Sequence, residues 1–335
     1  MGRHRPAHRR RVPIGPRVSA PAQRRPIVGY GLYLAAAALF GFNGTVSKTL
    51  LATGISAARL SQLRATLAFL VLLVAVLVTN RRSLRMRSRA EFRLLAAYGT
   101  AGVMLTQFLY FAAIHRIPVG IALIIEFTAP FMVAVWMRVA RGIAIGRRVV
   151  TGMLVAFSGL VLIAQVWNGF QLDTLGVLYA WGAAIALAIY FVLGEAATRA
   201  PYERDALSIT LYGFAASSAV WAVLQPWWSF PWHFLAGRSE PWGSAGWRLP
   251  LWLLVCSMVL LGTVVTFLLV VASFRHITAA QASSFGMAEP VLASIIAWLL
   301  IGESLGAWQI LGIGVAALGI AYAERSREQP VEFVE

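Results

Sequence analysis

The sequence predicts an all-α membrane protein with ten transmembrane helices, built as two inverted five-helix repeats around a central cavity. Three observations predict this fold: an apolar composition, ten stretches long enough to cross a bilayer, and an internal repeat with an odd number of helices. Hydrophobic residues make up 59% of the 335 residues and charged residues 13%, whereas soluble domains have roughly 25% charged residues. The lipid bilayer is therefore the expected surroundings of this chain.

A helix needs about 20 apolar residues to cross the hydrocarbon core of a bilayer. Stretches of this kind lie at residues 29–51, 57–79, 92–114, 117–139, 148–166, 173–195, 205–226, 250–273, 278–301 and 305–323. Several of them are joined by very short links, which are typical of neighbouring antiparallel helices. We expect each stretch to be one membrane span.

The net charge of +16 comes from arginines that are sorted by loop. They gather before the first span and in every second loop, while the intervening loops hold only Arg116, Arg238 and Arg248. Because basic loops stay in the cytoplasm, both termini are predicted to be cytoplasmic and the chain to be a multi-pass protein of the inner or plasma membrane. The arginines do not follow a folded basic face, so nucleic acid is not an expected partner.

The expected domain organisation follows from the spans. Residues 1–27 are predicted to be a disordered Arg/Pro-rich cytoplasmic tail, 28–166 the first repeat, 173–324 the second repeat, and 325–335 a cytoplasmic C-terminal tail. Cys256 is the one cysteine, which excludes an internal disulfide and a cysteine-based metal site. No cofactor or metal is expected.

The two repeats are seen when the sequence is shifted by 160 residues against itself. The shift places five Gly or Pro positions of the first half on the same residue types of the second: Pro130 on Pro290, Gly142 on Gly302, Gly146 on Gly306, Gly152 on Gly312 and Gly159 on Gly319. Matches at Gly and Pro indicate shared backbone geometry. Since each half has five spans, the second half must enter the membrane from the opposite side, as in many secondary transporters.

Particular motifs resemble a known family. The segment Ala288-Glu289-Pro290, followed by Gly302-Glu303, Gln309, Gly312 and Gly319, resembles the second repeat of EamA-type transporters of the drug/metabolite transporter superfamily. The segment 116–122, which leads to Glu126 and Pro130, is similar to the first repeat of their amino-acid and metabolite exporter branch, and Leu63-Arg64 also fits. The resemblance covers about residues 29–324. It implies ten helices, cytoplasmic ends, a central cavity and efflux of small metabolites.

Two glutamates at membrane depth are the main candidate site residues. Glu126 precedes Pro130 by four residues, and Glu289 directly precedes Pro290. An acidic group at this depth costs about 2.5–3.5 kcal/mol on insertion scales, so it usually serves a transport path or a buried pair. Each proline removes a helical hydrogen bond, which favours a cavity beside it. Arg64 is the nearest expected cation.

Three roles remain open for this group. Arg64 and a glutamate could form a structural ion pair, could bind the carboxylate and ammonium of a small-molecule substrate, or the acids could carry protons as the coupling ion. Further candidates are polar or aromatic residues at membrane depth, for which hydrogen bonding between helices is the alternative. They are Asn43, Gln107, Tyr110, Trp181, Tyr190, Gln281, Ser283 and Ser284.

The expected function is a secondary transporter that moves small metabolites by alternating access, exporting amino acids or related compounds. An intramembrane enzyme and a passive channel are the alternatives that use the same cavity. The enzyme is not favoured, because no HExxH spacing is present and the histidines lie in the tail or at loops. The sequence leaves a homodimer open.

Overall fold

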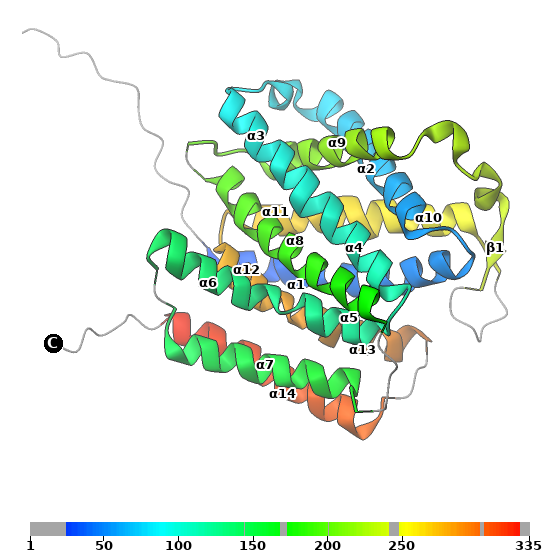
Figure 1. Cartoon of the computed structure of the whole chain (residues 1–335). Coiled ribbons are helices and arrows are strands. Elements are labelled where there is room, and N and C mark those ends of the chain that lie inside the picture. The colour runs from blue at the N-terminus through cyan, green and yellow to red at the C-terminus, as the bar shows by residue number, and fades with distance from the viewer. Residues whose placement is uncertain are drawn as a thin grey trace, which may run out of the picture.

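The structure, a computed structural model, describes residues 25–143, 145–167, 173–199, 201–240, 248–301 and 305–328. Those residues are mostly helical. A short ladder, in which β1 (Arg238–Ser239) pairs antiparallel with β2 (Leu249–Pro250), lies in the loop between the seventh and eighth spans. Figure 1 shows the helices packed in one bundle, with β1 at one end of it.

The first five spans comprise nine elements. They are α1 (Pro26–Ala52), α2 (Ala57–Thr79), η1 (Arg81–Leu84), α3 (Arg89–Ala97), η2 (Tyr98–Met104), α4 (Leu105–Ile114), α5 (Val119–Glu126), α6 (Ala129–Arg141) and α7 (Arg147–Ala164). The second five begin with α8 (Thr174–Thr198), α9 (Ala206–Leu224), η3 (Trp227–Ser229) and η4 (Trp232–Ala236). They continue with α10 (Leu251–Val259), η5 (Leu260–Val265), α11 (Thr266–Ser273), α12 (Ala279–Gly286), α13 (Ala288–Ile301) and α14 (Ala307–Glu328).

Within the described residues, nine helices are long and apolar enough to cross a membrane, when consecutive segments of one span are taken together. The remaining predicted span, the ninth in the chain, is α12–α13, which is interrupted at Met287. The prediction of ten helices is confirmed. α14 continues to Glu328, past the start of the predicted C-terminal tail at residue 325, and the domain boundaries stay predictions. The predicted N-terminal tail lies outside the described residues up to residue 24.

The inverted relation of the halves is visible where α7 packs on α14 (Figure 1). Close backbone contacts join Gly152 to Ala323, Ala156 to Gly319, Gly159 to Ala316 and Ile163 to Gly312. Residue numbers rise along one helix as they fall along the other, so the helices are antiparallel. The 160-residue shift relates the first of these four pairs to the fourth and the second to the third, as a twofold axis across the helices requires. The predicted inverted repeat is confirmed.

The first helix of each half packs into the other half. α1 lies against α11 and α13, and α8 lies against α4, α5 and α6. At their starts, Gly29 of α1 contacts Ile277, and Gly176 of α8 contacts Ile117, which is 160 residues before Ile277. This exchange brings helices of both halves around the centre of the bundle.

The fourth and ninth spans are interrupted beside their prolines. α5 ends at Glu126 and α6 starts at Ala129 with Pro130 in its first turn. α12 ends at Gly286, and Glu289 and Pro290 lie in the first turn of α13. Proline has no N–H and is tolerated in a first turn, where that donor has no helical partner. Both glutamates are therefore at helix interruptions in mid-membrane.

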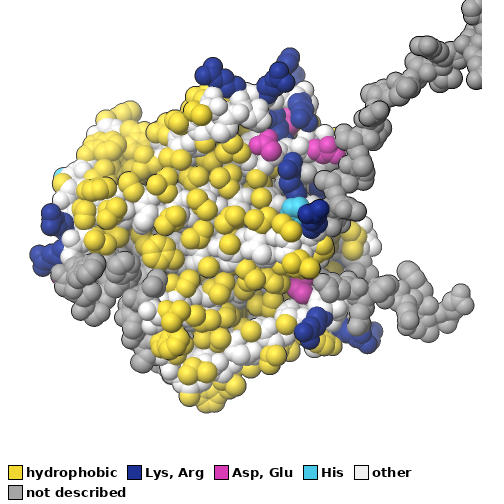
Figure 2. All heavy atoms as spheres, turned by 180° about the vertical axis from the view of Figure 1, so that it is seen from behind, with side chains coloured by type: hydrophobic (Ala, Val, Ile, Leu, Met, Phe, Trp, Pro, Cys, Tyr) yellow, Lys and Arg dark blue, Asp and Glu magenta, His cyan; other side chains and the backbone are white. Residues whose placement is uncertain are grey.

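The outer surface is apolar across its middle. Figure 2 shows hydrophobic side chains spread over this face, with Lys and Arg side chains confined to its two ends. Exposed residues of the middle zone include Val74, Leu154, Leu178 and Ile185. A lipid-facing band between two charged rims is the distribution expected of a membrane protein.

Candidate functional site

A cavity of about 70 Å³ lies between the two halves near the middle of the spans. This volume holds several water molecules, since one water needs about 10–15 Å³ on this measure. Its walls come from both halves: α1, α2, η2, α4 and α5 of the first, and α8, α11 and α13 of the second. The predicted central cavity is present in the structure.

Seven of the candidate residues line this cavity. They are Asn43, Arg64, Gln107, Tyr110, Glu126, Tyr190 and Glu289. They come from different helices and lie up to 246 residues apart between Asn43 and Glu289, so the fold alone brings them together. The structure places these side chains at one location, and their roles in binding stay predictions.

The other candidates are placed elsewhere. Trp181 is 43% exposed and lies on the outer surface, where an aromatic side chain faces lipid. Gln281 forms a capping box with Thr278 at the start of α12 and donates to Tyr30 Oη at 2.9 Å. Ser283 and Ser284 donate to the carbonyl of Ala280 within their own helix. None of these four side chains is among the residues that line the cavity, and their roles stay predictions.

Pro130 and Pro290 are buried beside the cavity rather than in its wall. They lie in the first turns of α6 and α13, next to Glu126 and Glu289, which do line it. At the first interruption, Thr128 Oγ1 donates to the carbonyl of Ile125 at 2.6 Å, which satisfies an acceptor freed by the break. The prolines therefore shape the backbone that presents the acids.

Arg64 is held by three neutral acceptors. Its Nε donates to Thr263 Oγ1 at 2.7 Å, its Nη2 donates to the carbonyl of Gly262 at 2.9 Å, and its Nη1 donates to Gln107 Oε1. Its guanidinium also lies 5.7 Å from the ring centroid of Phe111. Among the described residues it forms no ion pair with Glu126 or Glu289. The direct ion pair, one of the three roles left open by the sequence, is thus absent here, and two acceptors from η5 and one from α4 bind the guanidinium instead.

The two acids face the same cavity as this arginine. Glu126 is 7% exposed and Glu289 is half-buried. No Arg, Lys or His side chain of the described chain is within ion-pair distance of either carboxylate. An ionised carboxylate away from bulk water is costly without a partner. The site can therefore lower its free energy by taking up a cationic group or protons.

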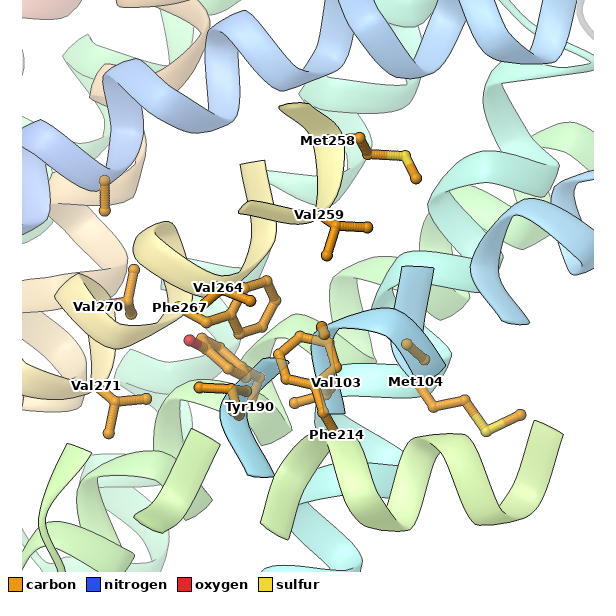
Figure 3. Packing of buried hydrophobic residues seen from close by; sticks show 14 of the residues in the cluster. Val103, Met104, Tyr190, Phe214, Met258, Val259, Val264, Phe267, Val270 and Val271 are labelled. Carbon is orange, nitrogen blue, oxygen red and sulfur yellow. The ribbon is translucent and has the colours of Figure 1, made fainter. Parts of the chain in front are cut away.

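The remaining wall is aromatic. Tyr190 stacks on Tyr98 with 5.3 Å between ring centroids, and it meets Phe267 edge to face at 5.6 Å. Phe267 in turn packs on Phe214 at 5.0 Å. Figure 3 shows Tyr190, Phe267 and Phe214 packed with Val103 and Val264. This aromatic cluster lies beside Arg64 and the two glutamates, so one side of the cavity is polar and the other is apolar.

Sequence reasoning missed several cavity residues. On α1 these are Tyr33, Phe40, Gly44 and Ser47, which with Asn43 follow a helical spacing of three, four and seven residues. Such spacing places them on one face of the helix. The signal was present in the sequence, but aromatic and small residues along an apolar helix are equally typical of packing. Thr263 of η5, which binds Arg64 without lining the cavity itself, was also missed.

An inverted-repeat bundle that encloses a polar cavity in mid-membrane defines a membrane transport protein. The sequence pattern of the EamA-like transporter family matches residues 27–165 and 174–323. The chain belongs to the EamA-like transporter family, of which each half carries one copy of the pattern, and it is not an enzyme.

Individual relatives agree with this assignment. The chain is 26% identical over 244 residues to the threonine/homoserine exporter RhtA of Escherichia coli, covering 71% of this chain and 74% of that protein. It is 25% identical over 222 residues to an uncharacterized transporter of Archaeoglobus fulgidus, covering 66% and 73%. It is 23% identical to the uncharacterized inner membrane transporter YicL of Salmonella typhimurium, covering 81% and 86%.

A solved crystal structure has the same fold. It aligns with a TM-score of 0.69 at 18% identity and covers 90% of this chain and 99% of the solved chain. At that identity the likeness shows the fold alone. The ten-helix fold inferred from the sequence is thereby confirmed.

Proposed function

We propose that this protein is a secondary transporter that exports amino acids or related small metabolites by alternating access, with the central cavity as its transport site. One observation carries the proposal: Arg64, Glu126 and Glu289 line one cavity between inverted halves, and none of the three is paired with another charged side chain of the described chain. The charged groups of these three side chains are therefore available to bind a ligand.

The charges fit a zwitterion. A guanidinium binds a carboxylate through paired N–H donors, and a carboxylate accepts from an ammonium group. An amino acid has both groups on one carbon atom, so it would offer a partner to Arg64 and to one of the acids. The name of the relative RhtA, a threonine/homoserine exporter, supports the same class of substrate.

The fold supports alternating access. Two inverted halves can rock against each other so that the cavity opens first to one side of the membrane and then to the other. We place both termini in the cytoplasm, because the arginine-rich loops lie on their side of the bundle. One acid binds the ammonium group of the substrate, and the other is then available to carry a proton as the coupling ion.

A flux assay tests this proposal. The purified protein in proteoliposomes should move at least one labelled amino acid from a panel of all twenty, and an imposed proton gradient should raise the rate. Movement of ions at channel rates without a gradient would favour a passive pore. Absence of transport of every amino acid would overturn the proposed substrate class.

The acids are tested by neutral replacements. Glu126→Gln or Glu289→Gln keeps the shape of the side chain and removes its charge. We expect at least one of them to lose the acceleration by a proton gradient, because a group that carries the coupled proton must change its charge. If both variants keep the full dependence on the gradient, the acids have no part in coupling.

A further inference from the structure

The eighth span contains a widened helical turn, η5, at the edge of the cavity. η5 is π-helical over Leu260–Val265. Two threonine hydroxyls bond five residues back here: Thr263 Oγ1 of η5 donates to the carbonyl of Met258 at 2.7 Å, and Thr266 Oγ1 at the start of α11 donates to that of Leu261 at 2.5 Å. Single π-helical turns inside α-helices occur frequently at functional sites.

Thr263 is fixed as an acceptor for Arg64. A hydroxyl has one hydrogen, and that of Thr263 is used by Met258, so its oxygen meets Arg64 Nε at 2.7 Å as an acceptor. The adjacent carbonyl of Gly262 accepts from Arg64 Nη2 at 2.9 Å. Thus η5 of the second half holds the arginine of the first half at two points.

The guanidinium keeps unused donors. Arginine has five N–H groups, and the structure uses one on each of Nε, Nη1 and Nη2 for described residues. One N–H therefore remains on each of Nη1 and Nη2 of Arg64, whose side chain lines the cavity. Two such groups can bind the two oxygens of a carboxylate.

A second unpaired group lies next to this arginine. Asn43 is 5% exposed, lines the cavity, and its Oδ1 is buried without a hydrogen-bond partner among the described residues. It lies against Gly262, whose carbonyl binds Arg64. A buried oxygen without a donor is rare and costs about 1–3 kcal/mol. An ammonium group bound beside a carboxylate would satisfy it.

We propose that Thr263 is a positioning residue for substrate recognition: it orients Arg64 so that the free guanidinium N–H groups bind the carboxylate of an amino acid, next to Asn43. This inference rests on the proposed function and names the group of the substrate that η5 recognises. The hydrogen-bond acceptors that hold this arginine are all neutral, so its remaining N–H groups are available to the carboxylate of a substrate.

The test compares Thr263→Val with the wild-type protein in proteoliposomes. The probes are the best-transported amino acid of the panel and its α-amide, in which a neutral amide replaces the carboxylate. A hydrogen bond to a charged group contributes about 1.5–3 kcal/mol. We therefore expect the KM for the amino acid to rise about 10-fold or more, the maximal rate to change little, and the KM for the α-amide to stay unchanged.

Three further variants separate positioning from folding. Thr263→Ser keeps the hydroxyl and should restore the wild-type KM, and Thr263→Ala gives a second loss of the hydroxyl should the valine variant fold poorly. Thr266→Val is the matched control, because Thr266 is buried in the same span and bonds five residues back but does not contact Arg64. Its KM should equal that of the wild type.

Two results would overturn this inference and leave the proposed function intact. One is an unchanged KM in both Thr263→Val and Thr263→Ala. The other is an equal rise in KM for the amino acid and for its α-amide, which would show a general disturbance of the cavity. A wild-type protein that moves no amino acid would instead reject the proposed function on which the inference rests.

Discussion

The two π-helical segments, η2 and η5, occupy equivalent places in the two halves but have different surroundings. Gly102 of η2 and Gly262 of η5 are 160 residues apart, and each lies against the first helix of the opposite half. Gly102 meets Tyr190 of α8, whereas Gly262 meets Asn43 of α1. The backbone was kept in both halves while the side chains diverged.

The surroundings differ in polarity. Around η2, Val103 is buried and packs with Tyr190 and Phe214 (Figure 3). Around η5, the position 160 residues later is Thr263, which binds Arg64. One half therefore supplies an apolar wall and the other anchors the charged group. The comparison teaches that inverted symmetry fixes where the cavity lies, while substitutions at a few equivalent positions decide what each wall offers.

The largest effect is expected from Arg64→Leu, which removes the positive charge that η5 holds at the cavity. It also leaves Thr263 and Gln107 without their donor, and each buried unsatisfied group costs about 1–3 kcal/mol. We expect amino-acid flux in proteoliposomes to fall by at least about 100-fold, which corresponds to about 2.7 kcal/mol. Arg64→Lys should recover little, because lysine lacks the planar fork. A folded Arg64→Leu protein with near wild-type flux would show that the polar side of the cavity is not part of the transport site.

An intermediate effect is expected from alanine at the two equivalent glycines. A Cβ on Gly262 would overlap the side chain of Asn43, and one on Gly102 would lie 3.0 Å from the Cα of Tyr190. Gly262→Ala should raise the substrate KM, since Asn43 must move within the site. Gly102→Ala should lower the unfolding temperature, since backbone must shift at a typical cost of about 1–3 kcal/mol. Thermal unfolding in detergent measures the unfolding temperature, and flux kinetics measure the KM. Equal changes in both quantities for the two variants would contradict the proposed difference between η2 and η5.

The smallest effect is expected from Trp181→Leu on α8, the helix that also carries Tyr190. Trp181 is on the outer surface, so the substitution exchanges one lipid-facing apolar side chain for another. Flux should stay within about twofold of wild type, a change below about 0.5 kcal/mol. Tyr190→Leu is the matched comparison, because it alters the apolar wall itself and should reduce flux more. A larger loss in Trp181→Leu than in Tyr190→Leu would contradict the assignment of the two faces.

Much of the fold could be predicted from the sequence, because lipid imposes simple requirements. The bounds of α2 agree with the expected span 57–79, and four of the glycines that revealed the repeat, Gly152, Gly159, Gly312 and Gly319, pack α7 on α14. The depth of Glu126 and Glu289 followed from their places within apolar stretches. These features depend on local composition and on backbone geometry, which the sequence shows directly.

The polar contacts of the site could not be predicted in the same way. The hydrogen bond from Arg64 to Thr263 joins residues 199 positions apart, and a π-helical turn has no distinct residue pattern. From the sequence, a glutamate was one possible partner of Arg64, since opposite charges are the simplest pairing, and no residue of η5 was considered. Likewise, nothing in the composition of α12 shows that Gln281 caps its own helix instead of facing the cavity.

The seam between α7 and α14 bears on how the chain assembles during synthesis. Its close contacts are made chiefly by Gly and Ala, which have no side-chain rotamers to restrict when the surfaces meet. α7 leaves the ribosome long before α14 and must wait in the bilayer with this surface uncovered. When α14 arrives, the two helices can join without reordering side chains, and the contact then connects the last helix of the first half to the last helix of the second.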